Sequence, residues 1–478
     1  MTAADTAGAK AAARAPSAEP DPTTKPGQTT KPGQTAEPGQ TAGRAPGADR
    51  SSLGELCAVL WPPPAIASLS RGPRVPRGLR VPRGLRVKPA RGRERDFIVL
   101  PSARRPRLLV PSGRRASAAA VRRYGEPGSF AAWAGSRALA LALAAGGAGV
   151  GLGGRLRVSA DPGTGSADPR TESADPGTGS ADLGTGTIEA YLRSVLGHEV
   201  LISTHLGAAR ANRKPVLQLL TPRGETAGFA KVSVNPLTRD LICAEHAALD
   251  TLAAGNLRTL TVPRVLHHGQ WRGREVLIMN ALPVWRRRKA LRPGQLTAAM
   301  TELTAVGGRS RGPLAGCDYL ARLRSRLEAS QAGPDRAAVS DALDTLAAAG
   351  PELSFGAWHG DWTGWNMAST ADGLLVWDWE RFATGVPVGF DFLHYRLQSD
   401  VVRRRRPPAE AADACVRDAA ACLAPFGVPA DEAELVALLY LAELSARYLA
   451  DRQAEAGARL GRPGTWLIPA IKKATKTL

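Results

Sequence analysis

The sequence predicts an α+β protein with two lobes, a small strand-rich lobe followed by a larger helical lobe, behind a long and largely disordered N-terminal region. Three features support this: Pro- and Gly-rich repeats before residue 95, short apolar runs of strand length between 188 and 283, and apolar residues at helical spacing from 284 onward. The expected divisions are a Pro/Gly/Arg-rich tail (1–95), a small α/β island (96–158), a repeat linker (159–187), the strand-rich lobe (188–283) and the helical lobe (284–478).

Three repeats lie within the first 187 residues. A Pro-Gly-Gln-Thr unit recurs between 24 and 41, an Arg-Val-Pro-Arg-Gly-Leu unit occurs twice over 74–85, and a Ser-Ala-Asp-Pro-Gly unit recurs over 159–187. None of them has an apolar face that neighbouring repeats could bury, which excludes a solenoid and favours disorder.

In the island 96–158, the apolar pattern predicts two short strands, 97–100 and 107–110, and two helices, 115–124 and 129–145. It is small for an independent core, so we expect it to pack on the strand-rich lobe. The apolar run 138–152 leaves two interpretations open, a membrane span or a buried helix that leads into a Gly-rich turn. Because the run is shorter than the roughly 18 residues of a spanning helix, no transmembrane span is expected.

The remaining chain predicts elements that fit the two lobes. The strand-rich lobe is expected to contain two helices (188–196 and 238–253), a hairpin (216–220 with 228–234) and a further strand (275–279). The helical lobe is expected to contain five helices (294–306, 317–329, 336–348, 409–423 and 431–451) and one short strand (374–377).

The formal net charge of +20 raises the question of an anionic partner, and most of that charge lies in one segment. Residues 71–123 carry 17 Lys and Arg against Glu94 and Asp96. This basic arm has two interpretations: it binds nucleic acid or an anionic surface through charge alone, or it is a disordered insertion without a partner. It lacks the interleaved aromatic residues on which single-strand binders stack bases.

Cysteine usage predicts a reduced, cytoplasmic protein. The five cysteines contain no Cys-x-x-Cys pair, and an odd number cannot all pair within one chain. No apolar stretch of a signal peptide follows Met1.

One segment carries the residue types that phosphoryl transfer requires. In Trp358–Asn366 (WHGDWTGWN), Asp361 precedes Asn366 by five residues, the separation of the catalytic-loop Asp and Asn of protein kinases. Asp378 follows the predicted strand 374–377, so its carboxylate is expected to face the same loop. We expect Asp361 to accept the hydrogen bond of the acceptor hydroxyl, and Asn366 and Asp378 to bind Mg²⁺ through oxygen atoms. The alternative for His359-Gly360-Asp361 alone is a tight polar turn that caps a helix.

Lys231 lies within an apolar strand, where its ammonium group is costly unless it is paired or reaches a ligand phosphate. Glu245, on the following helix, is the expected partner. The alternative is an edge-strand lysine that extends to water beside a solvated glutamate.

The chain contains three motifs of interest: His359-Gly360-Asp361 to Asn366, Asp378-Trp379-Glu380 and Gly389-Phe390-Asp391. Together they resemble the aminoglycoside phosphotransferase family, and the resemblance covers about residues 188–451. That family shares the protein-kinase-like fold and includes choline and other small-molecule kinases. The resemblance implies that Asp361 is the catalytic aspartate, that Asn366 and Asp378 are metal ligands, and that Lys231 is the phosphate-binding lysine with Glu245 as its partner. It also implies that Asp391 is a buried aspartate that steadies the catalytic loop, so that its role is structural.

The chain departs from that family at two places. No Gly-x-Gly-x-x-Gly precedes Lys231, so Gly207 is the candidate for the phosphate-covering loop, with Arg210 or Asn212 near phosphate. The residues after Asp361 are Trp362, Thr363 and Trp365, whose indoles either line an acceptor pocket or serve packing.

The sequence therefore predicts a phosphotransferase that moves the γ-phosphoryl group of ATP or GTP to a hydroxyl of an unidentified small molecule, with Mg²⁺. The arginine runs 286–288 and 403–406 do not recruit a cation, so a neutral or anionic acceptor is expected rather than an aminoglycoside. Two alternatives remain: a catalytically silent kinase-like binding scaffold, and a binder of nucleic acid or an anionic surface that acts through the basic arm.

Overall fold

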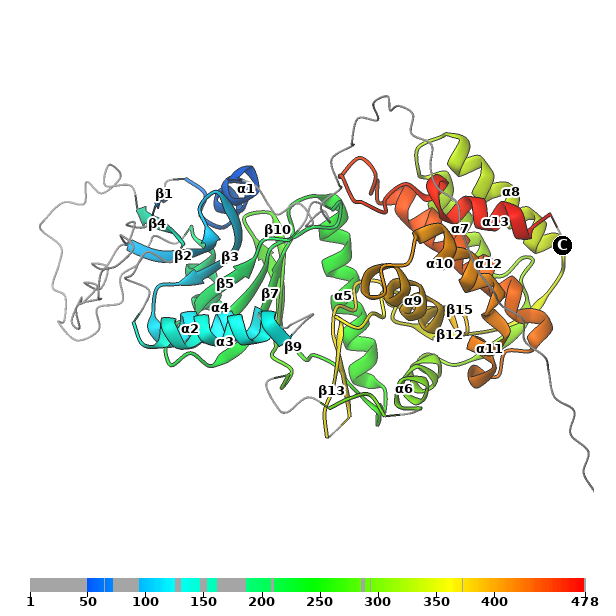
Figure 1. The fold of residues 1–478 in the computed structure, drawn as a ribbon, viewed down its shortest axis with the longest axis horizontal. Coiled ribbons are helices and arrows are strands. Elements are labelled where there is room, and N and C mark those ends of the chain that lie inside the picture. Colours follow the sequence, from blue (N-terminus) through cyan, green and yellow to red (C-terminus); the bar gives the residue numbers. More distant parts are fainter. Residues whose placement is uncertain are drawn as a thin grey trace, which may run out of the picture. The chain divides into compact units, whose positions relative to one another are not determined.

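The computed structural model describes residues 50–63, 65–71, 94–124, 130–146, 153–160, 186–207, 210–284, 289–292, 294–371 and 373–476. The predicted strand-rich lobe followed by a helical lobe is confirmed (Figure 1). The repeats at 24–41 and 74–85, and residues 161–185 of the third repeat, lie outside the described residues.

The strand-rich lobe is built on one nine-stranded antiparallel sheet with the order β1-β4-β2-β3-β5-β6-β7-β10-β9. The strands are β1 (Ala65–Arg71), β2 (Glu94–Ser102), β3 (Arg105–Pro111), β4 (Gly154–Ala160), β5 (Leu201–His205), β6 (Val216–Leu220), β7 (Thr226–Val232), β9 (Val265–Trp271) and β10 (Arg274–Asn280). Strand β3 joins β5 through the pairs Leu108–His205 and Leu109–Thr204. The island and the following lobe therefore share one sheet.

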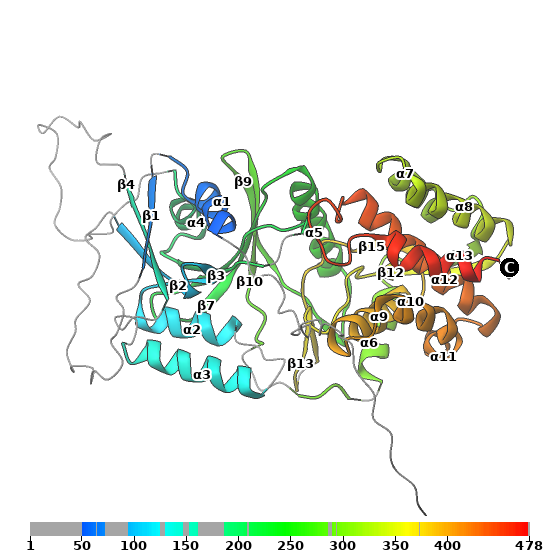
Figure 2. The same cartoon turned by 45° about the horizontal axis from the view of Figure 1, so that its top comes forward.

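Helices cover both faces of this sheet, as Figures 1 and 2 show. They are α1 (Arg50–Leu60) and α4 (Ile188–Leu196) on one face, and α2 (Arg114–Tyr124) and α3 (Phe130–Ala144) on the other. Because successive side chains of a strand point to opposite faces, Phe97 and Val99 of β2 pack with α1 and α4, whereas Ile98 and Leu100 pack with α2 and α3.

The expectation of a disordered tail that reaches residue 95 is wrong for residues 50–71, which are folded. They form α1 and β1, and β1 pairs with β4 along its full length. Helix α1 buries Leu56 and Leu60, and the indole Nε1 of the buried Trp61 donates to the Glu189 carboxylate at 2.9 Å. The segments on either side of this helix are rich in Pro and Gly, so the composition of the region hid the apolar residues that predict a helix.

Helix α5 (Pro236–Ala254) lies between the two lobes. It begins at a capping box formed by Asn235 and Thr238. It packs on the β9–β10 hairpin, while Ile242, Leu249 and Leu252 belong to the core of the helical lobe. No described helix, α3 included, is both long and apolar enough to cross a bilayer.

The helical lobe packs around α12 (Ala430–Ala450), whose side chains from Leu435 to Arg447 are buried on every side. The other helices are α6 (Gln295–Thr304), α7 (Asp318–Glu328), α8 (Pro334–Ala348), α9 (Phe390–Gln398), α10 (Pro408–Arg417), α11 (Ala419–Leu423) and α13 (Leu467–Ala474). A π-helical turn, η3 (Ser399–Arg403), and two 3₁₀ turns, η4 (Ala424–Phe426) and η5 (Pro463–Thr465), complete the lobe.

The expectation of a single strand in this lobe is wrong. The strands here are β8 (Leu260–Thr261), β11 (Ser310–Pro313), β12 (Glu352–Trp358), β13 (Met367–Ser369), β14 (Leu374–Val376) and β15 (Ala383–Pro387), in two small sheets. Strand β12 is buried over most of its length, so it lacks the alternating pattern of a half-exposed strand. The expected strand 374–377 is present as β14.

Candidate active site

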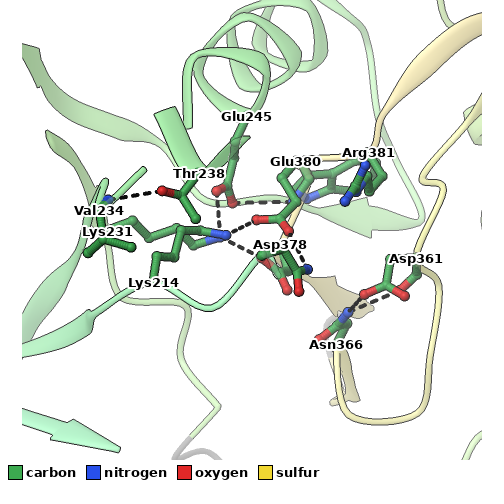
Figure 3. Close-up of polar contacts among 12 residues, drawn as sticks. Lys214, Lys231, Val234, Thr238, Glu245, Asp361, Asn366, Asp378, Glu380 and Arg381 are labelled. Atoms are coloured by element: carbon green, nitrogen blue, oxygen red, sulfur yellow. Dashed lines mark hydrogen bonds and ion pairs between the residues drawn. The ribbon is translucent and has the colours of Figure 1, made fainter. Parts of the chain in front are cut away.

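Lys231 links the two lobes at the centre of the candidate site. Its Nζ contacts a carboxylate oxygen of Glu245, on α5, and lies 2.5 Å from Oδ1 of Asp378, which follows β14 (Figure 3). Glu245 also accepts a hydrogen bond from the backbone N–H of Trp379 at 3.2 Å. The Lys231 side chain is only 7% exposed and that of Glu245 is 0% exposed, so the interpretation of a water-facing lysine is wrong.

A second lysine lies in the same group. Lys214, just before β6, forms an ion pair with Glu380, and both side chains are buried. Asn212 donates from Nδ2 to Oε1 of Glu380 at 3.3 Å. Carboxylate oxygens of Glu245, Asp378 and Glu380 all lie within 4.8 Å of one another. Two ammonium groups therefore meet three carboxylates in a site largely shielded from water.

Asp361 lies on the loop between β12 and β13, directly after a residue with a left-handed backbone. Gly360 has φ +82°, and a Cβ there would lie 2.3 Å from the backbone oxygen of Arg381. Only glycine fits this turn without moving the backbone, which explains the Gly before Asp361.

Both carboxylate oxygens of Asp361 are oriented by neighbours. Nδ2 of Asn366 donates to Oδ2 at 3.0 Å and to the Asp361 backbone oxygen at 3.0 Å. Nε2 of His394, on α9, donates to Oδ1 at 3.0 Å, while His394 Nδ1 lies 3.0 Å from the Tyr440 hydroxyl. The Asp361 side chain keeps 36% of its surface exposed, so an incoming hydroxyl can reach it.

Asp391 and Arg447 hold the backbone of this loop. The Asp391 carboxylate accepts from the N–H groups of His359 at 2.7 Å and Gly360 at 3.0 Å. Nη1 of Arg447 donates to the Gly360 carbonyl at 2.6 Å, and its guanidinium stacks over Trp358 at 5.1 Å from the ring centre. The loop is thus fixed from α9 on one side and α12 on the other.

Protonation states in the site are set by this packing. Burial opposes ionisation of Asp361, but the hydrogen bond and charge of His394 hold the Asp361 pKa below its usual value. Burial likewise opposes ionisation of Asp378, yet Lys231 and Lys214 hold its pKa well below the usual range. Burial lowers the pKa of His359 to about 4, so this ring is neutral and its Nδ1 accepts from the Asp361 N–H at 3.1 Å. Both aspartates are therefore ionised at neutral pH.

Oxygen donors for a magnesium ion lie between these groups. The amide nitrogen of Asn366 is committed to Asp361, which leaves its Oδ1 as the atom to offer a metal. The Asp378 carboxylate lies between the lysines and the Asp361–Asn366 pair in Figure 3 and is 33% exposed. Asp378 also has φ +74°, an unusual backbone conformation for a residue other than glycine. The donor set of one carboxylate and one amide oxygen fits Mg²⁺.

The structure brings together Lys231, Glu245 and Asp378 by direct contact, and Asp361 with Asn366. Gly207, which follows β5, is not among the residues joined by these contacts, and a Cβ there would meet no atom within 4 Å. The local packing therefore gives no reason for glycine at this position. Trp362 is fully buried and serves packing, whereas Trp365, on the same loop as Asp361, is 43% exposed.

Known proteins match this chain through their structures only. No protein-family model matches the sequence, and no curated protein matches it. A solved putative fructosamine-3-kinase of Haemophilus somnus is 17% identical, with 59% of this chain and 96% of that chain covered and a TM-score of 0.35. A putative fructosamine-3-kinase of Thermobifida fusca is 16% identical, with 62% of this chain and 100% of that chain covered and a TM-score of 0.33. A spectinomycin phosphotransferase in complex with ADP and spectinomycin is 14% identical, with 60% of this chain and 98% of that chain covered and a TM-score of 0.36. At such identities and TM-scores these similarities carry no argument about this chain.

Sequence reasoning missed the contacts of four residues in the site, Lys214, Glu380, His394 and Arg447. Lys214 and Glu380 come from segments 166 residues apart, and only folding shows that they pair. His394 lies one helical turn after Asp391 on α9, so a search for polar residues three positions beyond that aspartate would have found it.

Proposed function

We propose that this protein transfers the γ-phosphoryl group of ATP or GTP to a hydroxyl group of a small molecule, with Mg²⁺ as cofactor. The observation that carries the proposal is the contact of Lys231 with both Glu245 and Asp378, next to a loop that presents Asp361. A lysine, a metal-binding carboxylate and a carboxylate for the acceptor hydroxyl are the parts that phosphoryl transfer needs.

Each residue has a distinct task in this proposal. Lys231 and Lys214 offer positive charge to the nucleotide phosphates, and Glu245 holds Lys231 in place. Asp361 accepts a hydrogen bond from the acceptor hydroxyl, orients its oxygen towards the phosphorus and takes its proton late in the transfer. Asn366 and Asp378 would hold Mg²⁺, which neutralises charge on the phosphates when it is bound.

Two features near the loop favour a neutral or anionic acceptor. Trp365 offers an exposed indole next to Asn366, which suits the apolar face of a sugar-like or cyclic molecule. Arg403 lies beside the same loop, because a Cβ on Gly364 would be 3.6 Å from its Nη1. In contrast, Arg404 and Arg406 both pair with the buried Asp400, so these two arginines of the run are structural. Residues 286–288 lie outside the described part of the chain.

The proposal is tested by a screen of hydroxylated metabolites with labelled ATP and GTP, read by mass spectrometry. Asp361→Asn is expected to lower turnover by about a thousandfold or more while nucleotide still raises the melting temperature. Nucleotide that neither stabilises the protein nor is consumed with any acceptor would contradict the proposal. Magnesium-dependent nucleotide binding without turnover would instead identify a silent scaffold.

A further inference from the structure

A second group of possible ligand atoms lies in the strand-rich lobe, away from Asp361. Cys243 on α5, His268 on β9 and Glu275 on β10 place a sulfur, an imidazole nitrogen and a carboxylate oxygen within 4.8 Å of one another. The three residues come from three different elements, so only the tertiary fold brings them together.

The surroundings of these side chains leave their ligand atoms available. Nε2 of His268 is buried and makes no hydrogen bond within the described residues, although Oε2 of Glu275 lies 3.3 Å away. The imidazole of His246 stacks on the His268 ring at 4.2 Å between centres and limits its rotation.

The carboxylate and the thiol complete the set. Glu275 is 5% exposed and is held by Gln270, whose Nε2 donates to Oε1 at 2.8 Å, and by Arg239 at 3.6 Å. Oε1 is therefore engaged, while Oε2 faces His268. Cys243 is a free, exposed cysteine at the open side of the group, so an ion can enter from solvent.

We propose that Cys243, His268 and Glu275 bind one thiophilic divalent cation of the Zn²⁺ class, with water at the fourth position. Thiolate, neutral imidazole and carboxylate are the three ligand types that Zn²⁺ takes in proteins, and the observed separations need only small side-chain movements to surround an ion. On binding, the thiol of Cys243 releases its proton to solvent and its sulfur bonds to the metal.

The position of this site gives it a structural consequence. Cys243 and Glu245 are two residues apart on α5, and Glu245 is the partner of Lys231. An ion bound at Cys243, His268 and Glu275 would fix α5 to the β9–β10 hairpin and would therefore restrain the helix that positions Glu245.

The test uses the full chain freed of metal with a chelator and then supplied with Zn²⁺ alone. Alkylation of each cysteine by N-ethylmaleimide is mapped by mass spectrometry, and Cys317, outside the group, is the internal control. Zn²⁺ is expected to slow alkylation of Cys243 by about tenfold or more and to leave Cys317 unchanged. Equilibrium dialysis should find one bound ion fewer per chain in Cys243→Ser than in the unchanged protein.

Variants separate a built site from a thiol that binds metal by itself. His268→Gln and Glu275→Gln are each expected to remove the protection of Cys243, whereas Cys317→Ser keeps it, because serine preserves the cap at the start of α7. Cobalt(II) in place of zinc should give a thiolate charge-transfer absorption that Cys243→Ser abolishes. Unchanged alkylation of Cys243 with Zn²⁺, or equal protection in His268→Gln, would overturn the proposal.

Discussion

Replacement of Lys231 by methionine tests the charge arrangement of the site through stability as well as activity. Methionine fills a similar volume, but it leaves the fully buried Glu245 without its cation. Removal of one partner of a buried ion pair costs about 3–5 kcal/mol. We expect a loss of that size in the free energy of unfolding at about pH 8, together with loss of phosphoryl transfer. The exposed Lys473→Met is a matched control, and its effect should stay within about 1 kcal/mol.

The pH dependence of this loss identifies its cause. Burial already raises the pKa of Glu245, and removal of Lys231 raises it further. A carboxyl with a raised pKa in the folded protein binds a proton more tightly there, so the loss should shrink as pH falls towards about 5. Urea unfolding followed by tryptophan fluorescence at both pH values measures this, and Lys231→Met with Glu245→Gln should be more stable than Lys231→Met alone. A loss below about 1 kcal/mol at both pH values would refute the reasoning.

Three further predictions concern the loop and its surroundings. His394→Ala should lower kcat by about tenfold or more and move the acidic limb of the kcat/KM pH profile to higher pH, because the pKa of Asp361 then rises. His394→Gln should restore part of the rate. An acidic limb that does not move in His394→Ala would contradict the role of His394 in holding the Asp361 carboxylate ionised. Burial raises the pKa of Asp391 to about 7, so the contribution of Asp391 to the free energy of unfolding falls as pH rises from about 4 to 7. In Asp391→Asn, the free energy of unfolding should no longer show this fall between about pH 4 and about pH 7. Arg403→Gln should raise KM for an anionic acceptor and leave KM for nucleotide unchanged; equal effects on both would exclude contact with the acceptor.

The sequence predicted best those pairs of residues that lie close together along the chain, or that must pair because one of them is a buried charge. Asp361 and Asn366 share one loop, and their spacing is set by the turn between β12 and β13. Lys231 and Glu245 lie 14 residues apart, and a charged residue in a buried strand requires an opposite charge nearby. These relations are visible in a single sequence because they depend on neighbours or on burial.

The parts that the sequence did not predict depend on distant pairing. Strand β12 is buried in a small sheet with β11 and β15, which lie far from it along the chain, so its apolar run carried no period. Lys214 and Glu380 each look like a surface residue until the lobes bring them together. The helix at residues 50–60 has an apolar face, but its Pro- and Gly-rich surroundings dominated the composition of that region.

The shared nine-stranded sheet has a practical consequence for anyone who trims this protein. A shortened chain that starts at Ile188, the expected start of the strand-rich lobe, would expose the backbone hydrogen-bonding edge of β5 that now pairs with β3. It would also remove the indole that caps the buried carboxylate of Glu189. Unprotected edges of this kind promote aggregation. The smallest version suitable for expression should therefore retain the residues from Arg50 onward, and insoluble products from shorter versions would reflect a broken sheet rather than a defect in the candidate site.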